Sequence, residues 1–197
     1  MTARAVPASK RQAGVLLHVT SLPGPHGIGD LGPAARAWVE RLQEGGLALW
    51  QVLPIYPAGG GDSPYNATSS FAGDPMLLSL DDLIEDGWLG ADELTDAPGG
   101  DGGRVEFERL RPWKMARLRS AVTSWRRRAR ADEHYAYGRW LVRAGSWVGE
   151  VALFLALRER YGGMPWWEWP QELRLRETGA LERAARGLRD EIETHRV

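Results

Sequence analysis

The chain has 197 residues, enough for one domain with a real core, and its 43% hydrophobic and 26% charged residues are ordinary for a globular protein. Its net charge of −1 gives no global attraction to nucleic acid or to an anionic membrane, and the absence of cysteine excludes disulfides and thiolate metal sites. Residues 1–14 are polar and basic, and no apolar run reaches membrane-spanning length. The sequence therefore predicts a cytoplasmic protein.

The first half of the chain has the pattern of a β-α-β unit. The apolar run 13–19 predicts a buried strand, and 47–53 predicts a second strand with helices covering both faces. Between them, Pro33 suits the first turn of a helix. The spacing of i, i+3, i+4, i+7 predicts that this helix buries one face, made of Ala35, Trp38, Val39 and Leu42. Such a unit pairs its two strands in parallel.

The rest of the chain is predicted to be a long loop followed by helices. Residues 55–75 show no periodicity, 76–80 suggest a short strand, and a helix is expected to open at Asp81-Asp82. The Gly/Pro/Asp run 97–103 marks an internal boundary. Beyond it we expect helices near 115–125, 134–141 and 146–160, and a last amphipathic helix carrying Leu181, Ala185, Leu188 and Ile192. Most of the ten tryptophans are expected to be packing anchors.

Three patterns that could carry other functions are each better explained structurally. Gly27 to Gly32 has the letters of a dinucleotide fingerprint, but seven residues separate it from the strand and no acidic residue ends the second strand. The basic cluster at 126–130 lies among many carboxylates, which favours a solvated helix face over a nucleic-acid surface. His18 and His26 have no spaced nucleophile or metal-ligand partner, so structural or substrate-binding roles are favoured over catalysis.

The run Asp62-Ser63-Pro64-Tyr65 leaves two interpretations open. Asp, Ser and Pro all favour turns, so the run could be a simple turn. Tyr65 also offers a flat apolar face and a hydroxyl, which suit the C–H face and hydroxyl rim of a sugar ring. From chemistry alone the two interpretations are equal.

Several segments, in order, closely resemble the 4-α-glucanotransferases, the amylomaltase or disproportionating-enzyme family. They are Ser21 to Gly32, Leu49-Trp50-Gln51-Val52-Leu53-Pro54, Asp62-Ser63-Pro64-Tyr65, Phe71-Ala72-Gly73-Asp74-Pro75, Ala152 to Leu157, and Pro165-Trp166-Trp167-Glu168-Trp169-Pro170. The match covers residues 11–197. The resemblance implies a modified (β/α)₈ barrel of the α-amylase clan that moves α-1,4-glucan segments between maltooligosaccharides or starch-type glucans. It implies a cytoplasmic enzyme with no metal or organic cofactor and no nucleic-acid or membrane partner.

The resemblance also implies a retaining mechanism, in which one carboxylate forms a covalent glycosyl-enzyme and a second carboxyl group serves as acid and then base. The family's catalytic carboxylates are expected beyond the point that matches Val197, so none of Asp62, Asp74, Asp81 or Glu168 is assigned a catalytic role. Substrate contact is carried over to Tyr65 as the stacking ring, with Ser63 and Asp62 near the same subsites. Asp74 departs from the family's usual Asn, and a carboxylate only accepts hydrogen bonds.

We therefore expect an α/β chain holding the first units of a partial (β/α)₈ TIM-type barrel. Its expected divisions are an N-terminal tail at 1–12, barrel units with the substrate loop at 13–96, and a helical insertion subdomain at 104–197 that is truncated at its end. The isolated chain is expected to be inactive, with the remainder of the same enzyme chain as its partner. The alternative is a non-catalytic glucan-binding or regulatory module derived from the enzyme.

Overall fold

The computed structural model describes residues 11–99 and 103–197 and divides the chain into two compact units. The first unit contains the described residues up to Thr68 together with those of Gly73–Met115. The second contains Ser69–Ala72 and Ala116–Val197. The predicted tail at 1–12 and the predicted boundary at 97–103 include residues 1–10 and 100–102, which lie outside the described residues.

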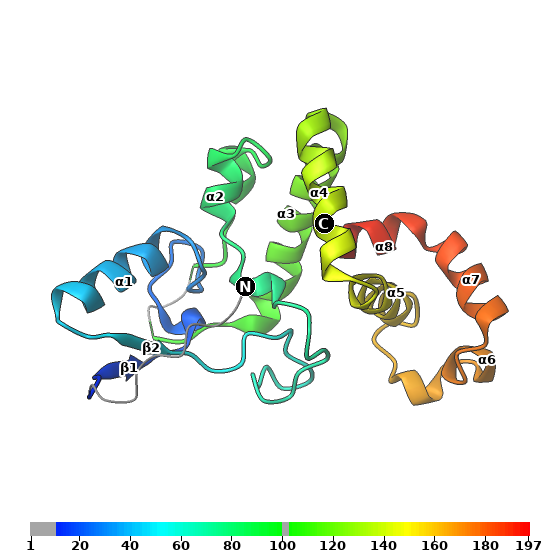
Figure 1. Cartoon of the computed structure of the whole chain (residues 1–197), viewed down its shortest axis with the longest axis horizontal. Coiled ribbons are helices and arrows are strands. Elements are labelled where there is room, and N and C mark those ends of the chain that lie inside the picture. The colour runs from blue at the N-terminus through cyan, green and yellow to red at the C-terminus, as the bar shows by residue number, and fades with distance from the viewer. Residues whose placement is uncertain (1–10, 100–102) are drawn as a thin grey trace. The chain divides into compact units, whose positions relative to one another are not determined.

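The first unit begins with the β-α-β arrangement that the sequence predicts. Strand β1 (Gly14–Leu16) and strand β2 (Leu49–Gln51) pair in parallel, with Val15 opposite Trp50, and helix α1 (Pro33–Glu44) connects them (Figure 1). Pro33 occupies the first turn of α1, where its missing N–H costs nothing. The parallel pairing and the helix are confirmed.

The predicted burial of both strands is wrong for much of their length. Val15 and Trp50 are half-buried, whereas Leu16 and Leu49, on the other face, are 57% and 50% exposed. In α1, Ala35 and Leu42 are buried but Val39 is exposed. The reason is that a parallel sheet hides both faces only when elements cover both. Within the described part of the chain the sheet has two strands.

Beyond the loop that follows β2, the first unit is mostly helical and contains a small apolar core. Helix α2 (Leu80–Glu85) follows a 3-10 turn at Pro75–Leu77, and a second such turn lies at Ala91–Leu94. The strand predicted at 76–80 is therefore wrong. Asp74 begins the 3-10 turn by accepting a hydrogen bond from the Met76 amide, and Ser79 caps α2 by accepting one from the Asp82 amide. The core of this unit contains Val19, Leu22, Ile28, Met76, Leu77, Leu80, Leu89, Leu110 and Trp113.

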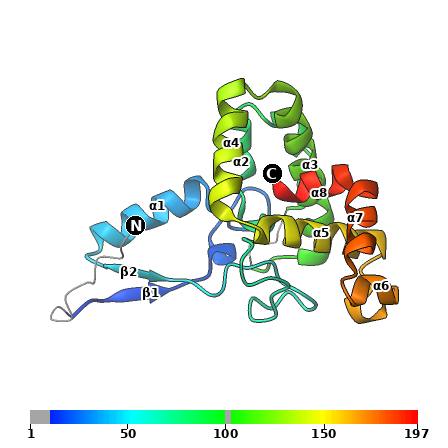
Figure 2. The ribbon, with the colours of Figure 1, turned by 45° about the vertical axis from the view of Figure 1, so that its right-hand side comes forward.

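Helix α3 (Phe107–Arg128) runs through the division between the units at Met115 and Ala116, and the second unit contains its later turns and five further α-helices. These are α4 (Ala131–Ala144), α5 (Trp147–Arg160), α6 (Gln171–Arg174), α7 (Thr178–Gly187) and α8 (Arg189–Arg196), seen from a second side in Figure 2. The last amphipathic segment is thus two helices, because the backbone at Leu188 leaves the helical region at φ −119° and ψ 30°.

The core of the second unit forms where α5 packs against the end of the chain. Ala156, Leu157, Trp169 and Leu188 are buried together, and the Trp169 indole N–H donates to the Met164 carbonyl at 3.0 Å. Trp113 and Trp169 are buried, as expected of packing tryptophans, whereas Trp140, Trp166 and Trp167 are exposed and the other five are half-buried.

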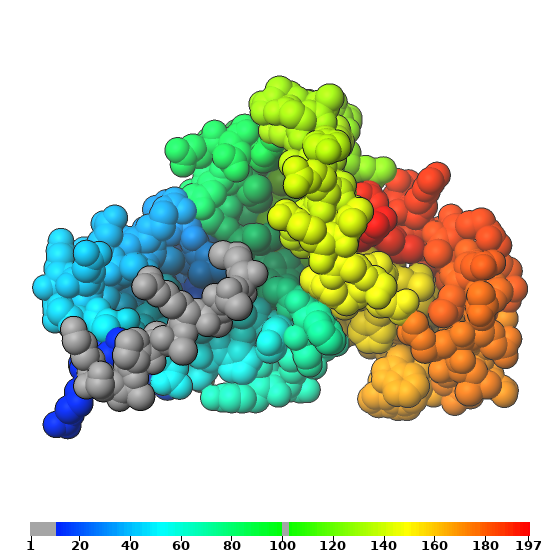
Figure 3. Space-filling model, viewed as in Figure 1, coloured from blue at the N-terminus to red at the C-terminus, as the bar shows by residue number. Residues whose placement is uncertain are grey.

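Helix α4 has no buried residue and lies at the surface that faces the viewer in Figure 3. Within the described ranges, no single helix has the length and apolarity to cross a membrane. The bent pair of α4 and α5 meets the same criteria jointly, by length and composition only.

Candidate functional site: an aromatic loop and its buried anchor

The predicted substrate loop is an ordered loop closed by backbone hydrogen bonds. Ala58 and Ala67 form an antiparallel bridge. The Gly59 amide donates to the Asn66 carbonyl at 2.6 Å, and the Thr68 amide donates to the Pro57 carbonyl at 2.9 Å. These bonds join the two arms of the loop, so its tip has a defined shape.

The three predicted site residues lie together at that tip. Tyr65 is 75% exposed, so both its ring and its hydroxyl reach solvent. The carbonyl of Ser63 accepts a hydrogen bond from the Asn66 amide at 3.0 Å, forming the turn that carries Tyr65. Ser63 and Asp62 are half-buried beside it. An exposed ring on an ordered turn meets the steric requirement for stacking on a sugar, and its contact with a sugar stays a prediction.

Asp62 is held in an uncommon conformation by an ion pair. Its φ is +53°, in the left-handed region that residues other than glycine seldom adopt, and the preceding Gly61 has φ +82°. One Asp62 carboxylate oxygen accepts a hydrogen bond from the Arg111 guanidinium at 2.6 Å. That guanidinium also lies over the Phe107 ring, 6.0 Å from its centroid. Arg111 on α3 therefore fixes the tip of the loop, a role that the sequence alone does not reveal.

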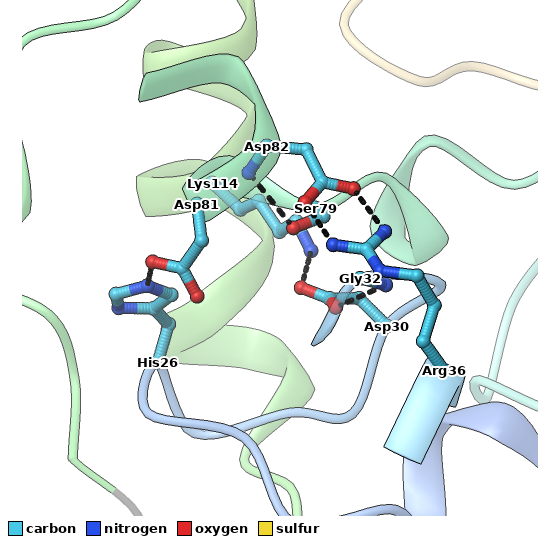
Figure 4. Close-up of polar contacts among 8 residues, drawn as sticks. All are labelled: His26, Asp30, Gly32, Arg36, Ser79, Asp81, Asp82 and Lys114. Carbon is cyan, nitrogen blue, oxygen red and sulfur yellow. Dashed lines mark hydrogen bonds and ion pairs between the residues drawn. The ribbon is translucent and has the colours of Figure 1, made fainter. Parts of the chain in front are cut away.

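A cluster of charged side chains lies beside the segment that follows this loop and leads into α2 (Figure 4). Lys114, only 1% exposed, donates to the Met76 carbonyl at 2.7 Å, and its ammonium nitrogen lies 3.8 Å from a carboxylate oxygen of Asp30. The other oxygen of Asp30 accepts from the Gly32 amide at 2.9 Å. The cluster thus joins α3 to two segments distant in sequence, one before α1 and one before α2.

Burial governs the acid–base behaviour of this pair. Desolvation raises the pKa of Asp30, and the nearby Lys114 ammonium opposes that rise. Desolvation lowers the pKa of Lys114, and Asp30 opposes that fall. Each charge is therefore costly alone and partly compensated by the other. Lys114 lies between the apolar residues Trp113 and Met115 of α3, which is a sequence signal that could have revealed it.

The predicted histidines have structural surroundings. His26 is hydrogen-bonded through Nε2 to Asp81 at 2.9 Å. His18 has a buried Nδ1 without a hydrogen-bond partner among the described residues, and desolvation lowers the pKa of its ring against the raising effect of Asp74. Whether either histidine has a structural or a substrate-binding role stays a prediction.

The geometry gives little support to nucleotide binding at Gly27 to Gly32 or to nucleic-acid binding at the basic cluster 126–130. Gly32 precedes α1, but its amide is already bonded to Asp30, and a Cβ at this position would lie 2.3 Å from the Ser79 hydroxyl. This helix start is thus occupied by the protein's own groups, where a nucleotide phosphate would need free amides. In the basic cluster, Arg126 pairs with Asp190 at 3.1 Å and Arg130 pairs with Asp132 at 3.1 Å, as on a solvated helix face.

The carboxylates of Asp62, Asp74 and Asp81, to which no catalytic role is assigned, are each bonded to another group of the first unit. Asp62 accepts from Arg111, Asp81 bonds His26, and Asp74 caps the 3-10 turn. Asp82 receives two hydrogen bonds from Arg36, at 2.7 and 2.9 Å. The Asp74 carboxylate thus accepts a backbone hydrogen bond, and an acceptor is all that this contact requires. These hydrogen bonds hold the backbone and the loop in position.

Comparison with known proteins identifies the family. A sequence profile described as 4-alpha-glucanotransferase matches residues 17–197, so the chain belongs to the 4-alpha-glucanotransferase family. It is 43% identical over 185 residues to the 4-alpha-glucanotransferase of Thermus thermophilus, with 94% of this chain and 36% of the relative covered. It is 34% identical to that of Synechocystis sp., with 94% and 37% covered.

A solved structure shows the same arrangement. The amylomaltase from Streptococcus agalactiae in complex with acarbose matches with a TM-score of 0.89 at 33% identity, covering 95% of this chain and 38% of that protein. The chain therefore spans between a third and two fifths of the length of these relatives. The family resemblance drawn from the sequence motifs is confirmed.

Proposed function

We propose that this chain is the N-terminal portion of a cytoplasmic 4-α-glucanotransferase, and that the loop carrying Tyr65 binds α-1,4-linked glucose units. The single observation that carries the proposal is the exposed Tyr65 ring on a hydrogen-bonded loop in a chain of this family. A relative of the same architecture was solved with acarbose, which supports a glucan ligand. Tyr65 stacks on a sugar ring, while Ser63 and Asp62 lie near the same subsites.

The full-length reaction is proposed to be transfer by retaining double displacement. A carboxylate attacks the anomeric carbon and the leaving sugar takes a proton from a carboxylic acid. The acceptor hydroxyl then attacks the glycosyl-enzyme as the same acid group, now ionised, takes its proton. The role proposed for Tyr65 is to hold a glucan in place, since fixing a reactant in position lowers the entropic cost of the chemical step. The carboxylates themselves are proposed to belong to the rest of the enzyme chain.

The exposed apolar face of the small sheet supports the proposal that this chain is completed by the rest of the enzyme. Leu16 and Leu49 are 57% and 50% exposed. Burying such side chains stabilises a fold by about 1.5–3 kcal/mol each, so their exposure favours a partner that covers them. We propose that β1 and β2 are the first strands of a partial (β/α)₈ barrel, and that residues 104–197 form a helical insertion.

Two measurements test the proposal. In a maltotriose disproportionation assay the purified 197-residue chain should release no glucose and form no longer maltodextrins. Calorimetric titration with maltoheptaose should show binding that Tyr65→Ala weakens. Tyr135→Ala is the matched control, because Tyr135 is 69% exposed on α4 and belongs to the second unit. Glucose release would refute inactivity, and equal binding by Tyr65→Ala would refute the loop assignment.

The same titration distinguishes the alternative function, a non-catalytic glucan-binding or regulatory module, from a portion of the enzyme. Tight binding that depends on Tyr65, from a monodisperse monomer with one sharp unfolding transition, would favour the module. Weak binding from a chain that self-associates through its exposed sheet would favour a portion of the enzyme.

A further inference from the structure

The second unit contains a pocket that lies outside the loop and its anchor. It is lined by Trp125, Arg126, His134, Tyr137, Arg189 and Glu193, and its volume is about 280 Å³. These residues come from α3, α4 and α8. The volume lies just below the range of roughly 300–1,000 Å³ typical of pockets for drug-sized ligands. The pocket is therefore suited to one or two small rings.

The wall of this pocket is aromatic. The Trp125 and His134 ring centroids lie 4.6 Å apart, and those of Trp125 and Tyr137 lie 5.1 Å apart at an interplanar angle of 75°. Contacts of this kind fix the orientation of the rings before any ligand arrives. A preformed aromatic wall suits the apolar C–H face of a sugar ring.

The rim of the pocket supplies hydrogen-bonding groups of both signs. Arg126 is paired with Asp190 at 3.1 Å, and Glu193 lies 3.3 Å from Arg196. Glu193 also accepts a hydrogen bond from the Tyr137 hydroxyl at 3.4 Å. Arg189, which is exposed, makes no ion pair or hydrogen bond through its side chain with another described residue. Because a carboxylate stands beside the guanidinium groups, the rim disfavours a phosphate and suits neutral hydroxyls that both donate and accept.

We propose that this pocket is an accessory binding site for an α-1,4-linked glucose unit, with the aromatic wall against the ring and Arg189 and Glu193 bonded to its hydroxyls. The proposal rests on the proposed function, in that it takes glucan as the ligand. It adds a second contact on a different unit of the chain, so that a long glucan has a place to bind besides the Tyr65 loop.

The test follows the indole N–H signal of Trp125 by two-dimensional NMR of the 197-residue chain during titration with maltotriose. The signal is assigned with Trp125→Phe. The titration is run in the wild-type chain and in Tyr65→Ala, which removes the loop ring. The Trp125 signal should shift in both. Arg189→Ala should need at least tenfold more maltotriose for the same shift, because a hydrogen bond to a charged group is worth about that factor.

The matched control is Arg127→Ala, since Arg127 is an exposed arginine on α3 that does not line the pocket, and it should titrate like the wild type. A second variant, Glu193→Gln, keeps the side-chain size and should also weaken binding. The proposal is overturned if maltotriose leaves the Trp125 signal unmoved, if Arg189→Ala titrates like Arg127→Ala, or if inorganic phosphate alone produces the shift. Failure of the loop assignment can be told apart from failure of the pocket proposal. If the loop assignment fails, Tyr65→Ala binds maltoheptaose like the wild type, whether or not the Trp125 signal shifts.

Discussion

Replacing Lys114 with methionine tests how strongly the buried charge cluster holds the first unit together. Lys114 lies almost fully buried on α3, with its ammonium nitrogen 2.7 Å from the Met76 carbonyl and 3.8 Å from Asp30. Methionine keeps the length and apolar stem of the side chain but removes the charge and all three donors. The Asp30 carboxylate then stays buried with the Gly32 amide as its remaining hydrogen-bond partner among the contacts described above.

The expected loss follows from two terms. Leaving a buried carbonyl without its donor costs about 1–3 kcal/mol. Removing one partner of a buried ion pair costs about 3–5 kcal/mol in total, because the other charge is left uncompensated. The separation of 3.8 Å is long for a direct pair, and methionine keeps the apolar stem of the side chain. We therefore expect the free energy of unfolding to fall by about 3 kcal/mol at pH 7.

The loss should depend on pH, with a sign that the burial of Asp30 determines. Desolvation already raises the pKa of Asp30, and removing the cation raises it further. A carboxyl group with a raised pKa in the folded state binds more protons folded than unfolded, so it favours folding as the pH falls. The deficit of Lys114→Met should therefore shrink as the pH falls from the folded-state pKa of Asp30 in the variant towards its lower folded-state pKa in the wild type.

Urea unfolding followed by tryptophan fluorescence, at several pH values, measures these quantities. The matched control is Arg109→Met, which removes an exposed cation 2.8 Å from Glu106 on the same helix and should cost less than about 1 kcal/mol. Asp30→Asn combined with Lys114→Met should lose less than the sum of the two single variants. The reasoning would be refuted by equal losses in Lys114→Met and Arg109→Met, or by strict additivity in the double variant.

Three further predictions follow from other contacts. Ser79→Ala removes the cap that accepts from the Asp82 amide, so the free energy of unfolding should fall by about 0.5–2 kcal/mol in urea unfolding, and an unchanged midpoint would contradict the cap. Arg111→Ala frees the Asp62 carboxylate, so calorimetry should show weaker maltoheptaose binding. The free energy of unfolding should change by less than about 1 kcal/mol, because both side chains of this ion pair are a third exposed. Burial and Glu193 raise the pKa of Tyr137 to about 12. The absorbance difference between the wild type and Tyr137→Phe should therefore titrate with a midpoint near pH 12. A midpoint near pH 10 would show that the hydroxyl is solvated.

Local sequence patterns predicted the helices well and the short elements poorly. Pro33, the Asp81-Asp82 pair and the apolar spacing in 146–160 each lie in a helix as expected, because capping groups and the 3.6-residue period are local properties. The strand expected at 76–80 is a 3-10 turn and the start of α2, since Asp74 and Ser79 bind amides two and three residues further along the chain. The break at Leu188 was likewise missed.

The sequence by itself determined the family, through motifs around Ser21–Gly32, Asp62–Tyr65 and Pro165–Pro170, and it placed Tyr65 on a loop after the second strand. Only the tertiary structure decided which charges are buried and what they touch. Lys114 meets Asp30 and Met76, and Arg111 meets Asp62, across separations in sequence that no local pattern reports. The physical reason is that burial and ion pairing depend on the packing of distant segments, whereas turns, caps and helical periodicity depend on neighbouring residues.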